Sequence, residues 1–330
     1  MIEVAIGIDI GGTNTKFGIV EESGSMLTQG SIKTDSQKGP KDFLARLNQA
    51  ICEHLDRLEG EILIKGIGIG APNANCHRGT IEHPANLPWE GVTPIVEMFQ
   101  EYFPYRMIIT NDANAAAVGE MMFGGAKGMR DFILITLGTG LGSGIVANGQ
   151  PINGHGGLAG EMGHTLIKPG GRLCGCGSRG CLETYCSATG ILRTVFELQA
   201  DTLEPSALRS VSWEELSAQK IFEEAQKGDP IALKAFELTG AYLGEGLASA
   251  VAYFNPEAIF LWGGLTKAGK LIFEPTRRHM EAHLMKVYKG KVKLVPSKLQ
   301  DINIAVLGAA AMIWKEVKEE RVQGLGLGVS

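Results

Sequence analysis

The stretch Ile6–Lys16, IGIDIGGTNTK, decides the fold of the N-terminal part of this chain. An apolar run ends in Asp9, two glycines make a turn, and Thr15–Val20 follows as the returning strand of a hairpin. Glycines let backbone N–H groups approach phosphate oxygens, and an acid at the strand end can hold Mg²⁺ through water. The stretch therefore predicts a phosphate-binding turn with Asp9 as the magnesium residue, and the turn residues are Gly11, Gly12, Thr13 and Lys16.

An ordinary tight hairpin is the alternative for this turn, and a second glycine turn weakens it. The first turn lacks the GxxxxGK[ST] pattern of a Walker A loop, and a hairpin rather than a helix follows it, unlike a dinucleotide fingerprint. LITLGTGLGSG, residues 134–144, repeats the strand–glycine–strand pattern around Gly138, Thr139 and Gly140. Gly263 and Gly264, which follow the apolar AIFLW, leave room for an adenosine at a strand end.

Two such hairpins facing each other would clamp a nucleoside triphosphate from both sides. This is the layout of the superfamily of sugar kinases, actin and heat-shock chaperone ATPases. The sequence thus predicts an α/β protein with a two-lobed actin-like ATPase (ribonuclease H-like) fold and a ligand cleft between the lobes. We expect the small lobe to comprise residues 1–111 and 305–330, and the large lobe residues 112–304.

Length, composition and charge exclude several classes of protein. The 330 residues suggest about two domains, at roughly 100–200 residues each. The 45 glycines are far above average usage, but without a G-X-Y period they do not indicate collagen. A net charge of −5 argues against nucleic-acid binding. The sequence contains no apolar run of 18 residues, so it predicts no membrane-spanning helix. Four of the six cysteines are clustered, which is typical of a reducing cytoplasm and not of a disulfide framework.

The segment TNDANAA places an acid at the end of the short predicted strand Met107–Thr110. Asp112 at this position is either an ordinary helix N-cap or a carboxylate directed at a substrate hydroxyl, as base and orienter. Phosphoryl transfer needs positioning and charge neutralisation, so an acid with a normal pKa is sufficient. Asn111 beside it offers both a donor and an acceptor to a sugar.

A segment rich in glycine, cysteine and histidine, residues 153–183, contains His164, Cys174, Cys176 and Cys181. Three thiolates and an imidazole without an open position are a structural Zn²⁺ set, although CxC spacing is unusual for zinc fingers. Buried thiols or a local disulfide are the alternatives, and a CxC disulfide would be strained. Glu161 and Glu183 flank this cluster. Together with His164, these carboxylates could form hydrogen bonds with the vicinal hydroxyls of a sugar. The alternative is that Glu161 and Glu183 are solvated surface charges.

The long segment LITLGTGLGSGIVANGQPINGHGGLAGEMGH, followed by CGCGSRGCLE, resembles the signature of the ROK family (repressor, open reading frame, kinase). DIGGTNTK, TNDANAA and the glycines at 263–264 fit the same family in order. The resemblance implies an ATP-dependent kinase that phosphorylates the 6-hydroxyl of a hexose. It implies that Asp112 is the catalytic base, that the zinc ligands are His164, Cys174, Cys176 and Cys181, and that the sugar is bound by Asn86, Asn111, Glu161, His164 and Glu183, with Gly70 nearby.

The family contains several functions, and the resemblance favours one of them. HPANLPWEG with the complete Glu/His/Glu set favours glucose over N-acetylmannosamine, N-acetylglucosamine or fructose. ROK repressors carry an N-terminal winged helix-turn-helix, for which the residues before Asp9 leave no room. A non-catalytic sugar-sensing protein is the second hypothesis, which an intact Asp112 and intact glycine turns disfavour. The family commonly forms dimers, so we expect a homodimer.

Overall fold

The computed structural model describes residues 1–84, 87–300 and 303–324, and the chain divides into two compact units. Unit 1 comprises Met1–Met129, Pro151–Gly160 and the described part of Lys298–Ser330, and unit 2 comprises Arg130–Gln150 and Glu161–Ser297. The first boundary between the units falls after Met129, whereas the sequence suggested a boundary after residue 111. The reason is that helix α3 (Asp112–Phe123) packs along the C-terminal helix α9 (Ile304–Gly324) within unit 1.

Unit 1 is built on a five-stranded sheet. Its order is β3-β2-β1-β4-β8, in which the first three strands are antiparallel and β4 and β8 run parallel to β1. The glycine turn that the sequence singled out joins β1 to β2, as expected. The strands are β1 (Ile2–Ile10), β2 (Asn14–Glu21), β3 (Met26–Lys33), β4 (Ile62–Gly70) and β8 (Met107–Thr110).

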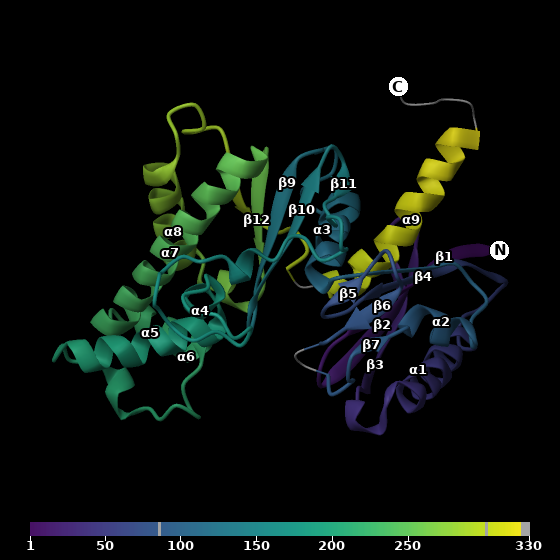
Figure 1. The fold of residues 1–330 in the computed structure, drawn as a ribbon, viewed down its shortest axis with the longest axis horizontal. Helices are drawn as coiled ribbons and strands as arrows, with labels where there is room; N and C mark the ends of the chain where they lie inside the picture. Colours follow the sequence, from purple (N-terminus) through teal and green to yellow (C-terminus); the bar gives the residue numbers. More distant parts are fainter. Residues whose placement is uncertain (85–86, 301–302, 325–330) are drawn as a thin grey trace. The chain divides into compact units, whose positions relative to one another are not determined.

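Alternating residues of β1 face two different helical layers, since side chains alternate across a strand. Ile6, Ile8 and Ile10 belong to an apolar core with α1 (Pro40–Leu55) and α2 (Ile95–Gln100). The opposite face lies directly on the backbone of α9, which Figure 1 shows in yellow. A Cβ on Gly7 would lie 2.0 Å from the carbonyl oxygen of Val306, so only glycine allows this approach.

Unit 2 repeats the same plan in a sheet of order β11-β10-β9-β12-β13. An antiparallel hairpin, β9–β10, is again followed by two strands parallel to its first strand. The two halves are therefore built alike, which confirms the repeat that the glycine turns predicted. The strands are β9 (Phe132–Leu137), β10 (Leu141–Ala147), β11 (Gln150–Pro151), β12 (Ala258–Trp262) and β13 (Lys293–Pro296).

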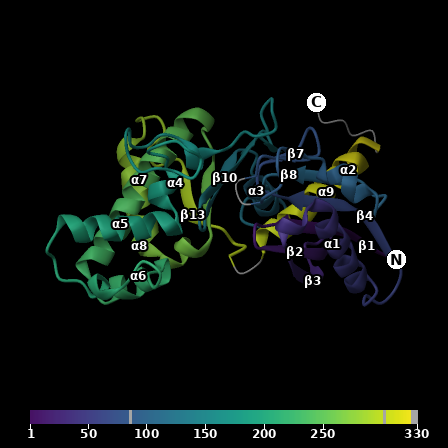
Figure 2. The same cartoon turned by 60° about the horizontal axis from the view of Figure 1, so that its bottom comes forward.

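Helices form most of the rest of unit 2. The longest, α7 (Pro230–Phe254), begins where Asp229 accepts a hydrogen bond from the Ala232 N–H at 3.0 Å, and it ends at Asn255 in the left-handed conformation. It lies beside α8 in both views (Figures 1 and 2). The others are α4 (Glu183–Cys186), α5 (Ala188–Asp201), α6 (Ala218–Gln226) and α8 (Lys270–His283).

A small three-stranded sheet in unit 1 was not expected. Its strands, β5 (Ala74–Asn75), β6 (Thr80–Glu82) and β7 (Val92–Thr93), are too short to leave a periodic pattern. Helix α2 follows β7 and begins at Ile95. Among the described residues, none of the helices is long and apolar enough to cross a bilayer.

Candidate functional site

Three neighbouring strands of unit 1 bring the predicted acids to one edge of the sheet. In register, Asp9 of β1 lies beside Gly70 of β4, and Gly70 lies beside Thr110 of β8. These strands are parallel, so their carboxyl ends meet, and Asn111 and Asp112 follow directly. A Cβ on Gly70 would lie only 3.5 Å from the Asp112 Cα. The edge is where ligands of open α/β sheets bind.

The first turn of α3 presents Asp112. Asn111, not Asp112, is the N-cap residue, and its Oδ1 accepts the Ala113 N–H at 2.8 Å. Asp112 is the first residue of the helix, where the helix dipole favours a negative charge. Its Oδ1 accepts the same N–H at 2.8 Å, and the residue keeps exposed surface although the surrounding protein partly desolvates the carboxylate. The N-cap alternative for Asp112 is therefore wrong, and its carboxylate is both oriented and accessible.

Two carboxylates of like charge lie close together at this edge. Burial raises the pKa of Asp9 to about 6, and the charge of Asp112 adds to this effect, whereas Lys16 opposes it. Lys16 stands directly opposite Asp9 in the β1–β2 register. Desolvation by the surrounding protein raises the pKa of Asp112, and the hydrogen bond from the Ala113 N–H partly offsets this rise. A cation would relieve this repulsion, so the residues fit a divalent ion held near Asp9.

The first glycine turn is fixed from a third strand. The Gly11 N–H donates to the Asn14 carbonyl at 3.2 Å, which closes the turn. Thr34, directly after β3, donates its hydroxyl to the Gly11 carbonyl at 2.7 Å and its N–H to the Thr13 carbonyl at 2.9 Å. Sequence reasoning missed Thr34, because nothing local marks a threonine that lies twenty residues from the turn it holds.

Gly138 and Thr139 of the second glycine turn and Gly264 line one cavity of about 730 Å³ in unit 2. This volume is in the usual range of small-molecule sites. A Cβ on Gly138 or Gly264 would meet no atom within 4 Å, so the protein itself leaves that space open. Sequence reasoning missed the remaining walls, which come chiefly from α6 and the turn Gly264–Ala268 and include Gln219, Phe222, Glu223, Gln226 and Lys267.

Glu183 joins the second glycine turn to the cysteine cluster. Its Oε2 accepts the Leu141 N–H at 2.9 Å, just after the turn. Its Oε1 lies 3.8 Å from Cys174 Sγ. The carboxylate is therefore held at a defined place and is not a solvated surface charge.

The cysteine cluster can hold a metal ion. One donor atom from each of His164, Cys174, Cys176 and Cys181 lies within 4.8 Å of all the others. Cys174 Sγ is 3.5 Å from His164 Nδ1, and the Sγ atoms of Cys176 and Cys181 are 3.7 Å apart. The three cysteines are free thiols. The Ser178 N–H lowers the pKa of Cys176 to about 7, which favours the thiolate that metals bind, whereas burial raises the pKa of Cys174 and Cys181. The donor set is that of a closed, tetrahedral Zn²⁺ site.

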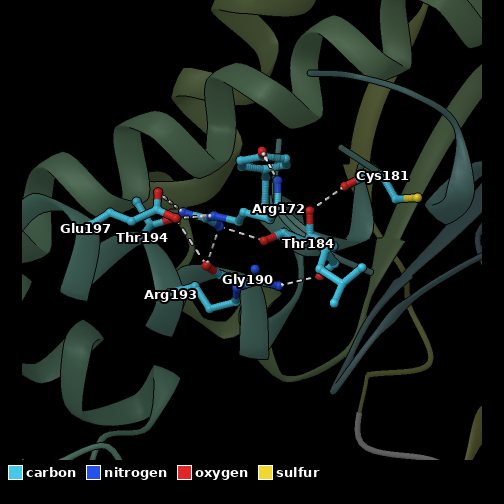
Figure 3. A network of polar contacts seen from close by, with 9 residues as sticks. Arg172, Cys181, Thr184, Gly190, Arg193, Thr194 and Glu197 are labelled. Atoms are coloured by element: carbon cyan, nitrogen blue, oxygen red, sulfur yellow. Dashed lines mark hydrogen bonds and ion pairs between the residues drawn. The ribbon is translucent and has the colours of Figure 1, made fainter. Parts of the chain in front are cut away.

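A buried guanidinium anchors the loop that carries these cysteines (Figure 3). The Arg172 Nη1 donates to the carbonyl oxygens of Thr184 at 2.6 Å and Gly190 at 3.0 Å, and Nη2 donates to Thr194 Oγ1 at 2.9 Å. Nε and Nη2 also form a bidentate pair with Glu197, and the guanidinium stacks 4.4 Å above the Tyr185 ring. The loop is thereby fixed to α4 and α5.

The remaining predicted sugar residues lie in unit 2 or outside the described chain. In unit 2, Glu161 precedes the short 3₁₀ turn Met162–His164 and His164 ends it, and both residues are exposed. The Met162 N–H ties that turn to β10 by donating to Ser143 Oγ at 3.1 Å. Asn86 lies outside the described residues.

Comparison with protein-family models matches residues 5–316 to the ROK family. The chain belongs to the ROK family. Its fold is the two-lobed actin-like ATPase fold that the glycine turns predicted. A glucokinase of Halalkalibacterium halodurans is 38% identical over 288 residues, which span 85% of this chain and 86% of the relative. A glucokinase of Thermotoga maritima is 32% identical over 322 residues, 97% of this chain and 98% of that one.

Among solved structures, a ROK family glucokinase from Streptomyces griseus in complex with glucose and AMPPNP superposes with a TM-score of 0.78. It is 31% identical, and the superposition covers 94% of this chain and 98% of that one. The ROK resemblance drawn from the glycine and cysteine motifs is therefore confirmed along almost the whole chain.

Proposed function

We propose that this ROK chain is an ATP-dependent hexose kinase that converts glucose to glucose 6-phosphate. The observation that carries the proposal is the strand register that places Asp9 and Asp112 at one sheet edge, with Asp112 oriented and open to solvent. The cavity at the second glycine turn, of a size suited to a nucleoside, supports it. The glucokinase relatives support glucose as the acceptor.

In this reaction Asp112 accepts the proton of the sugar 6-hydroxyl. The oxygen attacks the γ-phosphorus of ATP, its bond to phosphorus forms as the bond to the β-phosphate oxygen breaks, and ADP leaves. Asp9 would hold Mg²⁺ through water, and the ion when bound neutralises charge on the phosphates. Lys16, which faces Asp9, adds a second positive charge on the same side.

The proposed ligands of the sugar hydroxyls are Asn111, Glu161, His164 and Glu183, together with Asn86, which lies outside the described residues. The cysteines and His164 would hold a structural Zn²⁺. Since His164 Nδ1 faces Cys174, the ion would leave Nε2 to a sugar oxygen. The zinc would thus fix the orientation of a sugar ligand without taking part in phosphoryl transfer.

A coupled assay of ADP formation over glucose, mannose, fructose, N-acetylglucosamine and N-acetylmannosamine tests the proposal. We expect the highest kcat/KM with glucose. A higher value for another sugar would reassign the substrate within the family. Glucose binding in a calorimeter with no turnover on any of the five would instead establish a non-catalytic sugar-binding protein. Light scattering on the same preparation tests the homodimer that we also propose.

A further inference from the structure

A second group of metal-binding side chains lies in unit 2, on helices α7 and α8, and the proposed function does not use it. Glu245 on α7 and His279 and His283 on α8 each offer a donor atom, and the three atoms lie within 4.8 Å of one another. The two histidines are four residues apart, so they share one face of α8. Figures 1 and 2 both show the two helices side by side.

Small residues on α7 create this juxtaposition. A Cβ on Gly244 would lie 2.5 Å from the Thr276 carbonyl oxygen and 2.8 Å from the His279 Cβ. A Cβ on Gly240 would lie 2.6 Å from the ring of Pro275. The helix backbones therefore approach closely, and His279 is brought against the α7 face that also carries Glu237 and Glu245, two turns apart.

Hydrogen bonds determine which ring nitrogens are open. His279 Nε2 lies 3.1 Å from Glu237 Oε1, so this nitrogen carries the hydrogen and Nδ1 keeps its lone pair. Arg278 and then His279 hold the pKa of Glu237 below its usual range, which keeps that acceptor ionised. His283 Nδ1 lies 2.8 Å from the His279 carbonyl, which can only accept, so Nε2 is open on the second ring.

We propose that Glu245, His279 and His283 bind a divalent borderline transition-metal ion such as Zn²⁺, with Glu237 as the residue that orients His279. Two neutral imidazoles and one carboxylate suit Zn²⁺, Co²⁺ or Ni²⁺, whereas Mg²⁺ and Ca²⁺ prefer oxygen ligands alone. A carboxylate that accepts from the second nitrogen of a ligating histidine is the usual outer partner of such sites. The bound ion would link α7 to α8, apart from the cysteine cluster.

Metal analysis followed by calorimetric titration with Zn²⁺ tests this site in the full chain. The metal analysis determines how much metal the starting protein already holds, the cysteine cluster is filled to one equivalent, and the titration then looks for a second equivalent. We expect the wild type to bind a second equivalent of Zn²⁺, and millimolar Mg²⁺ should not displace that ion. His283→Ala and His279→Ala should each weaken the second binding at least tenfold, and Glu237→Gln should weaken it by about 10–100-fold.

His155→Ala, at an exposed histidine of unit 1, is the matched control and should bind two equivalents like the wild type. His283 is exposed, so its replacement does not threaten folding. A wild type that binds only the first equivalent would overturn the site. A second equivalent that persists in both histidine variants would overturn it as well, because the ion would then lie elsewhere. Unchanged affinity in Glu237→Gln would overturn the orienting role.

Discussion

Replacing Arg172 by methionine tests how the cysteine loop is held in place. Its side chain is only 6% exposed, whereas that of its ionic partner Glu197 is 55% exposed. An ion pair with so exposed a partner contributes about 0.2–1 kcal/mol. The larger effect should come from the buried carbonyl oxygens of Thr184 and Gly190, each of which costs about 1–3 kcal/mol when left without a donor.

The two carbonyls together would cost about 2–6 kcal/mol, but Gly190 still accepts from the Thr194 hydroxyl at 3.1 Å, so the total lies in the lower half of this combined range. We expect Arg172→Met to lower the free energy of unfolding by about 3 kcal/mol. Glu197→Gln should lower it by less than about 1 kcal/mol. Urea unfolding of both variants, each with its metal content determined, measures the difference.

The two variants together distinguish the Arg172–Glu197 ion pair from the hydrogen bonds that Arg172 donates to the buried carbonyls. If Glu197→Gln cost as much as Arg172→Met, the ion pair and not the buried carbonyls would dominate, and the reasoning would be refuted. A chelator should also remove metal faster from Arg172→Met than from the wild type, since the loop loses its anchor. An unchanged release rate would show that the anchor does not restrain the cysteines.

Three further predictions concern the proposed active site. Because the pKa of Asp9 is about 6, this residue takes up a proton as the pH falls through 6, so kcat/KM for ATP should decline below that pH. A decline that begins only near pH 4 would contradict the shift. Lys16→Met removes the charge that lowers the pKa of Asp9 and should move the acid limb to higher pH. Gly264→Ala adds a methyl group to space that is open in the protein, so it should leave the stability unchanged but raise the KM for ATP about tenfold. The control Gly156→Ala also adds a methyl group in open space, but it should leave the KM for ATP unchanged.

The local patterns of the sequence were sufficient to predict the two glycine hairpins and, through their repetition, the fold class. A strand, a glycine turn and a returning strand are contiguous in the chain, so their signal survives without tertiary information. The cysteine cluster was equally readable, because three of its four members lie within eight residues. Asp112 could be singled out because a strand end and a helix start meet there.

Contacts between distant segments could not be predicted in this way. Thr34 and Arg172 hold functional loops through hydrogen bonds to backbone, which leave no spacing pattern. The cavity walls on α6 look like any amphipathic helix until the fold brings them to Gly264. Nor does the sequence show that Gly7 and Gly244 allow neighbouring helices to approach closely.

The central claim is that Asp112 acts as the base of a glucose kinase, and the kinetics of Asp112→Asn test it most directly. Wild type and variant are compared for glucose-dependent ADP formation, with glucose binding measured by calorimetry on the same samples. The account predicts glucose 6-phosphate from the wild type, and a kcat lower by about 10²–10⁴-fold in the variant with glucose still bound. A variant of near-normal kcat, or a wild type that binds glucose without turning it over, would contradict it.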